Sequence, residues 1–125
     1  MSSLPNLLSL SVAVGSQFSE SFVFQNEDKS LMNLTGKIFE FSIRTDPIQT
    51  SATAPVVSVN STSSTANGTI TVNTFTATVT VTVTATGMAL LSQRQFFYTL
   101  WMDEGLADAT AMVSGSMFAS NVSAP

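Results

Sequence analysis

The sequence predicts an all-β fold, and three features of the chain lead to that prediction. Apolar and polar residues alternate with the two-residue period of a β-strand in several segments, most strictly in TFTATVTVTVTAT at 74–86. Glycine, proline and clusters of small polar residues separate these segments at short intervals, as turns do. No long segment carries an apolar stripe with the helical period.

The first three predicted strands lie in the amino-terminal part of the chain, at 8–14, 18–24 and 37–44. In the first two, leucine, valine or phenylalanine recurs at most alternate positions, and GSQ at 15–17 turns the chain between them. The polar NEDKS at 26–30 is the next predicted turn. Both faces of the third strand are largely apolar, and Glu40 and Arg44 share one of them if the strand is regular.

The middle of the chain predicts a long loop followed by a hairpin. The loop begins after Asp46-Pro47 and contains one short strand, VVSV at 56–59. It continues into NSTSSTANG at 60–68, which we expect to be a linker or an exposed turn. Residues 69–72 and 74–86 then form the hairpin, with Phe, Ala and Val at the odd positions of 74–86 toward the core and the threonines toward solvent.

The carboxy-terminal part begins with one helical turn in GMALLSQ at 87–93 and continues into an aromatic strand, RQFFYTLWM at 94–102. Two of the aromatic side chains in this strand are expected in the core and the others on its second face. Asp103-Glu104-Gly105 makes a tight turn. The last strand spans 109–122, and Gly115 marks a bulge or a close backbone approach.

Together these segments predict an immunoglobulin-like antiparallel β-sandwich of about seven to eight strands. A chain of 125 residues is long enough for one core, so we expect one domain over 8–125, preceded by an amino-terminal arm at 1–7. The residues expected to be largely buried are Phe22, Phe24, Ile38, Ile43, Val79, Val81 and Leu100.

Composition argues against several classes of function. The chain has no Cys and no His, which removes thiolate nucleophiles, imidazole bases and the commonest zinc ligands, so we expect no enzymatic activity, cofactor or metal. Four basic residues against eight acidic ones give a net charge of −4, and we expect no nucleic acid partner. No basic residue precedes Lys29 and serines interrupt the apolar residues before it, so we expect a protein made in the cytoplasm, with no membrane partner.

Two acidic sets are candidates for a chemical site, and each has a structural explanation that we prefer. Asp103, Glu104 and Asp108 do not have the spacing of a calcium-binding EF-hand loop, so we expect an exposed acidic hairpin tip. Glu20 and Glu40 would suit glycoside chemistry as a carboxylate pair, but a domain this small leaves little room for a cleft.

The threonines of 74–86 resemble the threonine arrays of ice-binding proteins. Such arrays need several parallel rows on a flat, repeating sheet, whereas the sequence indicates one row and no internal repeat. We therefore interpret the row as the solvent-facing side of one long strand.

Four stretches of the chain, in their order, resemble a β-sandwich module of tailed-bacteriophage virion proteins. They are LMNLTGKIFEFSIRT at 31–45, NGTITV at 67–72, TGMALLSQ at 86–93 and FFYTLWMDEGLADATAMVSGSMFASNVS at 96–123. Proteins with this module include baseplate upper proteins and small head-associated or fibre-adaptor proteins. The resemblance implies a non-enzymatic building block of a virion.

Within that class, the short chain favours a capsid decoration or cement protein, with a tail, baseplate or fibre adaptor as the alternative. The implied partners are the major capsid protein or tail and baseplate proteins, and the implied location is the virion, assembled in the host cytoplasm. We expect a homo-oligomer such as a trimer. A carbohydrate-binding module that uses exposed aromatics such as Trp101 is a further alternative.

The candidate partner-binding residues are Leu4, Pro5 and Leu7 in the arm. Pro5 stiffens the chain, and the two leucines have no place in the predicted sandwich, so we expect a neighbouring subunit to bury them. The polar segment 45–68 is the second expected docking element, because loops on a rigid scaffold often carry binding.

Overall fold

The structure, a computed structural model, describes residues 6–7, 10–45, 55–62, 65–92, 94–103 and 110–120. The elements within these ranges are β1 (Asn6–Leu7), β2 (Leu10–Ala13), β3 (Phe18–Val23), β4 (Phe39–Arg44), β5 (Val57–Asn60), β6 (Gly68–Asn73), β7 (Thr78–Val83), α1 (Ala85–Met88), β8 (Arg94–Met102) and β9 (Thr110–Ser120). The strands far outnumber the single short helix among the described residues. The all-β fold is therefore confirmed.

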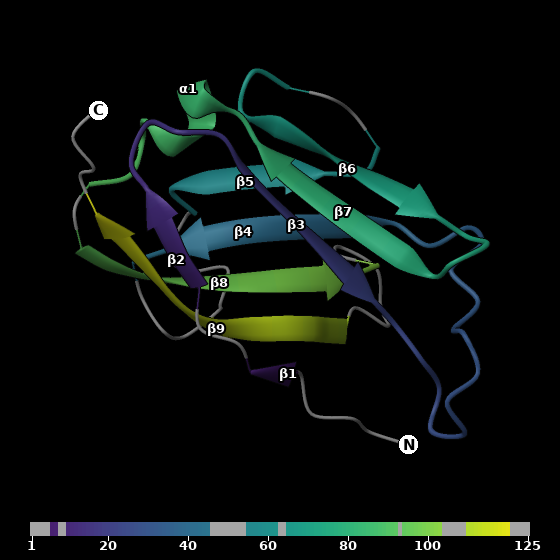
Figure 1. Ribbon diagram of the computed structural model, residues 1–125. Helices are drawn as coiled ribbons and strands as arrows, with labels where there is room; N and C mark the ends of the chain where they lie inside the picture. The colour runs from purple at the N-terminus through teal and green to yellow at the C-terminus, as the bar shows by residue number, and fades with distance from the viewer. Residues whose placement is uncertain are drawn as a thin grey trace.

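The strands form two sheets that lie one in front of the other (Figure 1). The six-stranded sheet has the order β1-β9-β8-β4-β5, with β2 also paired to β9. The three-stranded sheet has the order β3-β7-β6 and lies nearer the viewer in Figure 1. The chain crosses from the first sheet to the second between β2 and β3, through the predicted turn at 15–17.

The sequence predicted sheets that are antiparallel throughout, and this is wrong for two strands: β1 and β2 both run parallel to β9. Every other pairing of named strands is antiparallel within the described residues. Parallel neighbours cannot be joined by a tight turn. Their pairing therefore leaves no turn signal in the sequence, and β1 and β9 lie near opposite ends of the chain.

Aromatic and aliphatic side chains fill the space between the sheets. The ring of Phe41 on β4 lies 6.1 Å from that of Phe18 and 5.6 Å from that of Tyr98, and Phe24 stacks on Phe39 at 6.4 Å. Six of the seven predicted core residues are buried: Phe22, Phe24, Ile43, Val79, Val81 and Leu100. The exception is Ile38, which is half-buried because it precedes β4, whose inward positions are Phe39, Phe41 and Ile43.

The threonine segment forms a shorter strand than the predicted 74–86. Residues 74–77 form the turn between β6 and β7, in which the Asn73 side-chain oxygen accepts hydrogen bonds from the N–H groups of Phe75 and Thr76 at 3.0 and 3.2 Å. Ala77 has a positive φ of 51°. Phe75 consequently points away from the core and is 91% exposed. The alternating pattern continues through this turn, so periodicity alone could not detect it.

Helix α1 forms the predicted corner between β7 and β8, starting two residues earlier than expected. Thr84 caps it by accepting a hydrogen bond from the N–H of Gly87 at 3.2 Å. Met88 and the nearby Leu91 are buried against the core. The last threonines of the alternating pattern therefore serve a helix and its cap.

Two further local predictions are revised. The irregularity in β9 lies at Met112, because Leu100 pairs with Val113 whereas Trp101 pairs with Ala111; Gly115 pairs in register with Tyr98. The segment 60–68, predicted to be a linker or an exposed turn, contains a turn closed by backbone hydrogen bonds between Thr65 and Gly68. It begins inside the fold, since Ser61 exchanges two hydrogen bonds with Phe39, each 2.9 Å long.

We predict that Gly68→Ala destabilises the protein more than Gly36→Ala. Both glycines have positive φ, 149° and 76°, which costs about 1–3 kcal/mol for another residue. A Cβ at Gly36 would meet nothing, whereas a Cβ at Gly68 would collide with the backbone oxygen of Thr82. The collision should add about 1–3 kcal/mol to the loss in free energy of unfolding. Urea denaturation measures the free energy of unfolding of both variants. Equal losses in the two variants would contradict the close approach of Gly68 to the Thr82 backbone.

Candidate functional site

The amino-terminal arm is partly integrated into the six-stranded sheet. Asn6 and Leu7 pair in parallel with Val113 and Ser114 of β9, so backbone pairing begins before residue 8, the predicted start of the domain. Leu4 and Pro5 lie outside the described residues. The side chain of Leu7 is also outside the description, so the proposed contacts of these three residues stay a prediction.

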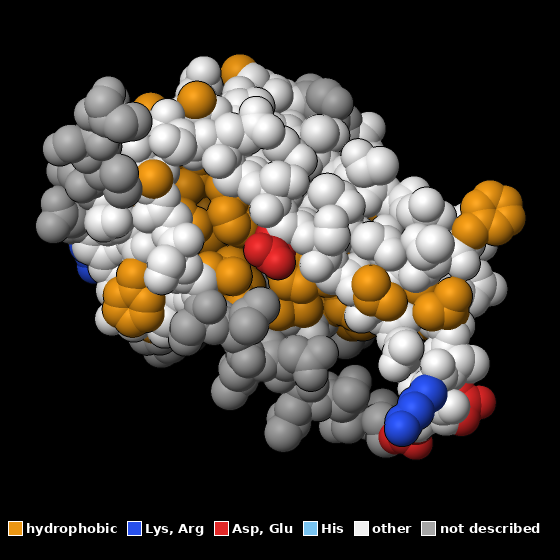
Figure 2. All heavy atoms as spheres, in the orientation of Figure 1, with side chains coloured by type: hydrophobic (Ala, Val, Ile, Leu, Met, Phe, Trp, Pro, Cys, Tyr) orange, Lys and Arg blue, Asp and Glu red, His pale blue; other side chains and the backbone are white. Residues whose placement is uncertain are grey.

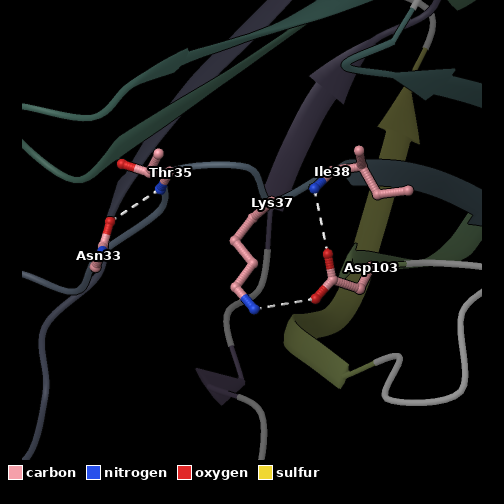
Figure 3. Close-up of polar contacts among 5 residues, drawn as sticks. All are labelled: Asn33, Thr35, Lys37, Ile38 and Asp103. Atoms are coloured by element: carbon pink, nitrogen blue, oxygen red, sulfur yellow. Dashed lines mark hydrogen bonds and ion pairs between the residues drawn. The ribbon is translucent and has the colours of Figure 1, made fainter.

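Asp103 is buried, whereas an exposed acidic hairpin tip was predicted. Its carboxylate faces Lys37 and Ile38 (Figure 3). Lys37 Nζ lies 3.4 Å from its Oδ2, and the Ile38 N–H donates to its Oδ1 at 3.3 Å. The Asp103 N–H in turn donates to the Ile38 carbonyl at 2.6 Å. This brace ties the end of β8 to the segment leading into β4. Its partners are 66 residues apart in sequence, which is why local spacing did not reveal them.

The other acidic candidates do not converge. Glu20 lies on β3 opposite Val81 and therefore faces the inside of the sandwich, whereas Glu40 lies on the outer face of β4, opposite Trp101. Within the described ranges, no three acidic side chains are grouped so as to hold a metal ion. Glu104 and Asp108 lie outside the described residues.

Glu20 lines a cleft of about 300 Å³ where β2 and β3 part to join different sheets. The residues lining it are Ser11, Val12, Ala13, Ser16, Gln17, Phe18, Ser19 and Glu20. This cleft holds one carboxylate and not the pair that glycoside chemistry requires. Burial and the charge of Glu20 raise the pKa of Tyr98 to about 12.

The aromatic strand β8 divides its side chains between two faces, as predicted. Phe96 and Tyr98 are buried in the core. Phe97 and Trp101 occupy the opposite face and are half-buried. Packing therefore accounts for this aromatic run.

The outer face of the three-stranded sheet carries Ser and Thr side chains on all three strands, where the sequence indicated one row. The threonine row of β7 lies between a row on β3 and a row on β6. Across the strands, the paired positions are Ser19–Thr82–Thr69, Ser21–Thr80–Thr71 and Val23–Thr78–Asn73. We call the Ser and Thr residues among them the hydroxyl array. The sequence carries a signal for the rows on β3 and β6, namely the short alternations SES at 19–21 and TIT at 69–71. These alternations do not reveal how the two strands pair with β7.

A second surface feature is an apolar end beside the turn between β6 and β7. Phe75 is 91% exposed, Val23 58% and Leu31 48%. Val23 pairs with Thr78 next to that turn, and the bridge between Gln25 and Leu31 follows directly after β3. Figure 2 shows hydrophobic side chains projecting at this end of the molecule. We call Val23, Leu31 and Phe75 the apolar end.

Comparison with known proteins finds no matching family model and no significantly similar curated protein. No helix in the described part of the chain is long and apolar enough to cross a membrane.

We predict that Asp103→Ala costs more stability than Asp103→Asn. Alanine removes the acceptor for the Ile38 N–H, which costs about 1–3 kcal/mol, and it must adopt the φ of 61° found at this position. Asparagine keeps a side-chain oxygen and tolerates positive φ. Denaturant unfolding of the two variants gives the comparison, and equal losses would show that the ion pair with Lys37, which both variants lack, dominates over the hydrogen bond from Ile38.

We also predict that the tyrosine phenol titrates at a pH near 12, measured by the near-ultraviolet absorbance of tyrosinate. Tyr98 is the single tyrosine of the chain, so the signal is unambiguous. Because its pKa in the unfolded chain is about 10, the native state retains the proton longer, and stability falls as the pH rises from about 10 to 12. Glu20→Gln should lower the pKa of Tyr98, and an unchanged pKa would place Glu20 too far away to act.

Proposed function

We propose that the protein is a non-enzymatic structural component of a tailed-phage virion, a capsid decoration or cement protein that docks on the head. The resemblance of the four sequence stretches suggests the class. The strand order supports the finer fold that we propose, an immunoglobulin-like sandwich: β3-β7-β6 corresponds to one sheet of such a domain and β9-β8-β4-β5 to the other.

The observation that best supports docking is the apolar end. Phe75 stands at the tip of a turn whose backbone is fixed by the Asn73 side chain, so binding would immobilise little additional chain. A large aromatic side chain that is 91% exposed is unfavourable in water and is typical of the anchors at protein interfaces. Val23 and Leu31 extend the apolar area around it.

In this proposal the partner is the major capsid protein, and the protein works in many copies, as a homo-oligomer such as a trimer. The amino-terminal arm, with Leu4, Pro5 and Leu7, supplies a second contact. Tail or baseplate proteins are the alternative partners.

We predict that Phe75→Ser weakens binding to purified heads lacking this protein by roughly thirtyfold, the loss of about 2 kcal/mol expected for an aromatic anchor. Phe118→Ser is the matched control, because Phe118 is 48% exposed but lies on β9 in the other sheet. Saturation binding measures affinity and the number of sites. Equal affinities of Phe75→Ser and the unmodified protein would exclude the apolar end as the docking surface.

The same assay separates the alternatives. Binding of the protein to purified tails but not to heads would show that it is an adaptor and not a capsid decoration protein. Removal of residues 1–5 leaves β1 in place and tests the arm. We expect this truncation to weaken binding to heads while the unfolding transition stays unchanged. A change in the fluorescence of Trp101 with soluble glycans, in the absence of binding to either particle, would favour a carbohydrate-binding module.

A further inference from the structure

We propose that the cleft between β2 and β3 binds a primary ammonium group on a short alkyl chain, with the Glu20 carboxylate as its counter-charge. The proposal is independent of the apolar end and does not rest on the proposed docking function. It is carried by an inward-facing carboxylate that no lysine or arginine of the chain neutralises, in the wall of a preformed cleft.

The cleft is preformed because its two walls are held by different sheets. β2 and β3 part after the turn that joins them and enter the two sheets (Figure 1). β2 pairs with β9 at four positions, and β3 pairs with β7 at six. The turn between them is closed by a hydrogen bond of 3.2 Å from the Ser16 N–H to the Ala13 carbonyl. A ligand therefore finds a space of about 300 Å³, enough for a small molecule, without a rearrangement of the backbone.

The Glu20 side chain brings a negative charge into this cleft. The neighbouring inward positions of β3 are Phe18 and Phe22, and the residue opposite Glu20 on β7 is the buried Val81. The Glu20 side chain is half-buried, and none of the hydrogen bonds or ion pairs among the described residues involves its carboxylate. A partly buried charge without a partner is unfavourable, because it loses hydration and gains no contact in exchange. A bound cation would supply that contact.

No basic side chain of the protein can take this role. The chain has four lysines and arginines, and all of them lie in the described ranges. Lys37 pairs with Asp103, and Arg94 lies over an aromatic ring of its own strand at 5.5 Å. Lys29 is exposed in the turn after β3, and Arg44 lies on the outer face of β4. The counter-charge therefore has to come from a bound group.

The charge of Glu20 also acts on the core behind the cleft. The pKa of Tyr98 is raised to about 12, first by burial and then by the Glu20 carboxylate. The ring of Phe41 lies 6.1 Å from that of Phe18 and 5.6 Å from that of Tyr98, so these aromatic side chains extend from the cleft into the core. Beside such side chains, water screens the attraction between the carboxylate and a cation less than it does on an open surface.

The other lining residues select the kind of cation. Ser16 and Gln17 supply side-chain oxygens, which accept the hydrogen bonds that an ammonium group has left after contact with the carboxylate. Val12 and Phe18 supply apolar surface for an alkyl chain. A quaternary ammonium group has no N–H to donate and is typically bound by a cage of several rings, whereas Phe18 is the single aromatic residue lining this cleft. A calcium ion requires more oxygen ligands than one carboxylate provides.

The test titrates the protein with n-butylammonium and follows the backbone amide signals by nuclear magnetic resonance. The neutral ligand n-butanol, of similar size, is the control for filling of the cleft without a charge. Glu20→Gln removes the charge of the cleft, and Glu27→Gln is the matched control, because Glu27 is exposed in the turn after β3 and does not line the cleft. Gln17→Lys is a second cleft variant at an exposed position, and its own ammonium group should occupy the carboxylate.

We expect n-butylammonium to bind the unmodified protein and Glu27→Gln with a dissociation constant on the order of 1 mM, and to shift the signals of residues 11–20. Glu20→Gln and Gln17→Lys should each weaken this binding roughly tenfold, and n-butanol should bind more weakly by a similar factor. Absence of these shifts in the unmodified protein would overturn the proposal. Equal affinity of Glu20→Gln and the unmodified protein, or of n-butanol and n-butylammonium, would overturn it as well.

A short lysine-containing peptide with blocked ends separates two sources of the ammonium group. Tighter binding of the peptide than of n-butylammonium would assign the cleft to a lysine side chain of a partner protein. Weaker binding of the peptide would assign it to a free amine. Either result supports an ammonium site, and neither depends on binding to heads.

Discussion

Val79, Val81 and Val83 on β7 are fully buried between the two sheets, and the rest of the structure depends on that burial. β7 is the central strand of its sheet, so a slip by one residue would turn all three valines toward water, at a cost of about 1.5–3 kcal/mol each. This fixes the register of β3 and β6 on either side. The outward hydroxyls are aligned as a consequence, and the turn that carries Phe75 is held at one end of the sheet.

The sequence predicted a strand correctly where the residues of that strand alone determine its conformation. The two-residue period identified β7, and the aromatic run identified β8, whose aromatic residues lie on the two faces as expected. The sequence did not predict the ends of β7, because the alternation of apolar residues and threonines continues through a turn and into a helix. Asn73 bends the chain by accepting two backbone hydrogen bonds, and Thr84 caps a helix, yet both lie within or beside an uninterrupted alternation.

The features that matter for a site depend on distant pairings, and these could not be predicted from local spacing. The serines of β3 became part of the hydroxyl array only through their register with Thr80 and Thr82. Asp103 is buried because Lys37 and Ile38 meet it from another part of the chain. A strand pattern indicates which residues share a face, but it contains no information about which strands become neighbours.

Glu20 has a consequence for how copies of this protein behave when crowded together. It points inward from β3, which ends the three-stranded sheet, and no other strand among the described residues pairs with β3 on that side. Another chain that extended the sheet at this edge would enclose the Glu20 carboxylate in the cleft between β2 and β3, and the loss of hydration opposes that step. Only 10% of the residues are charged, so a carboxylate at this position contributes to opposing unspecific edge-to-edge pairing of folded copies.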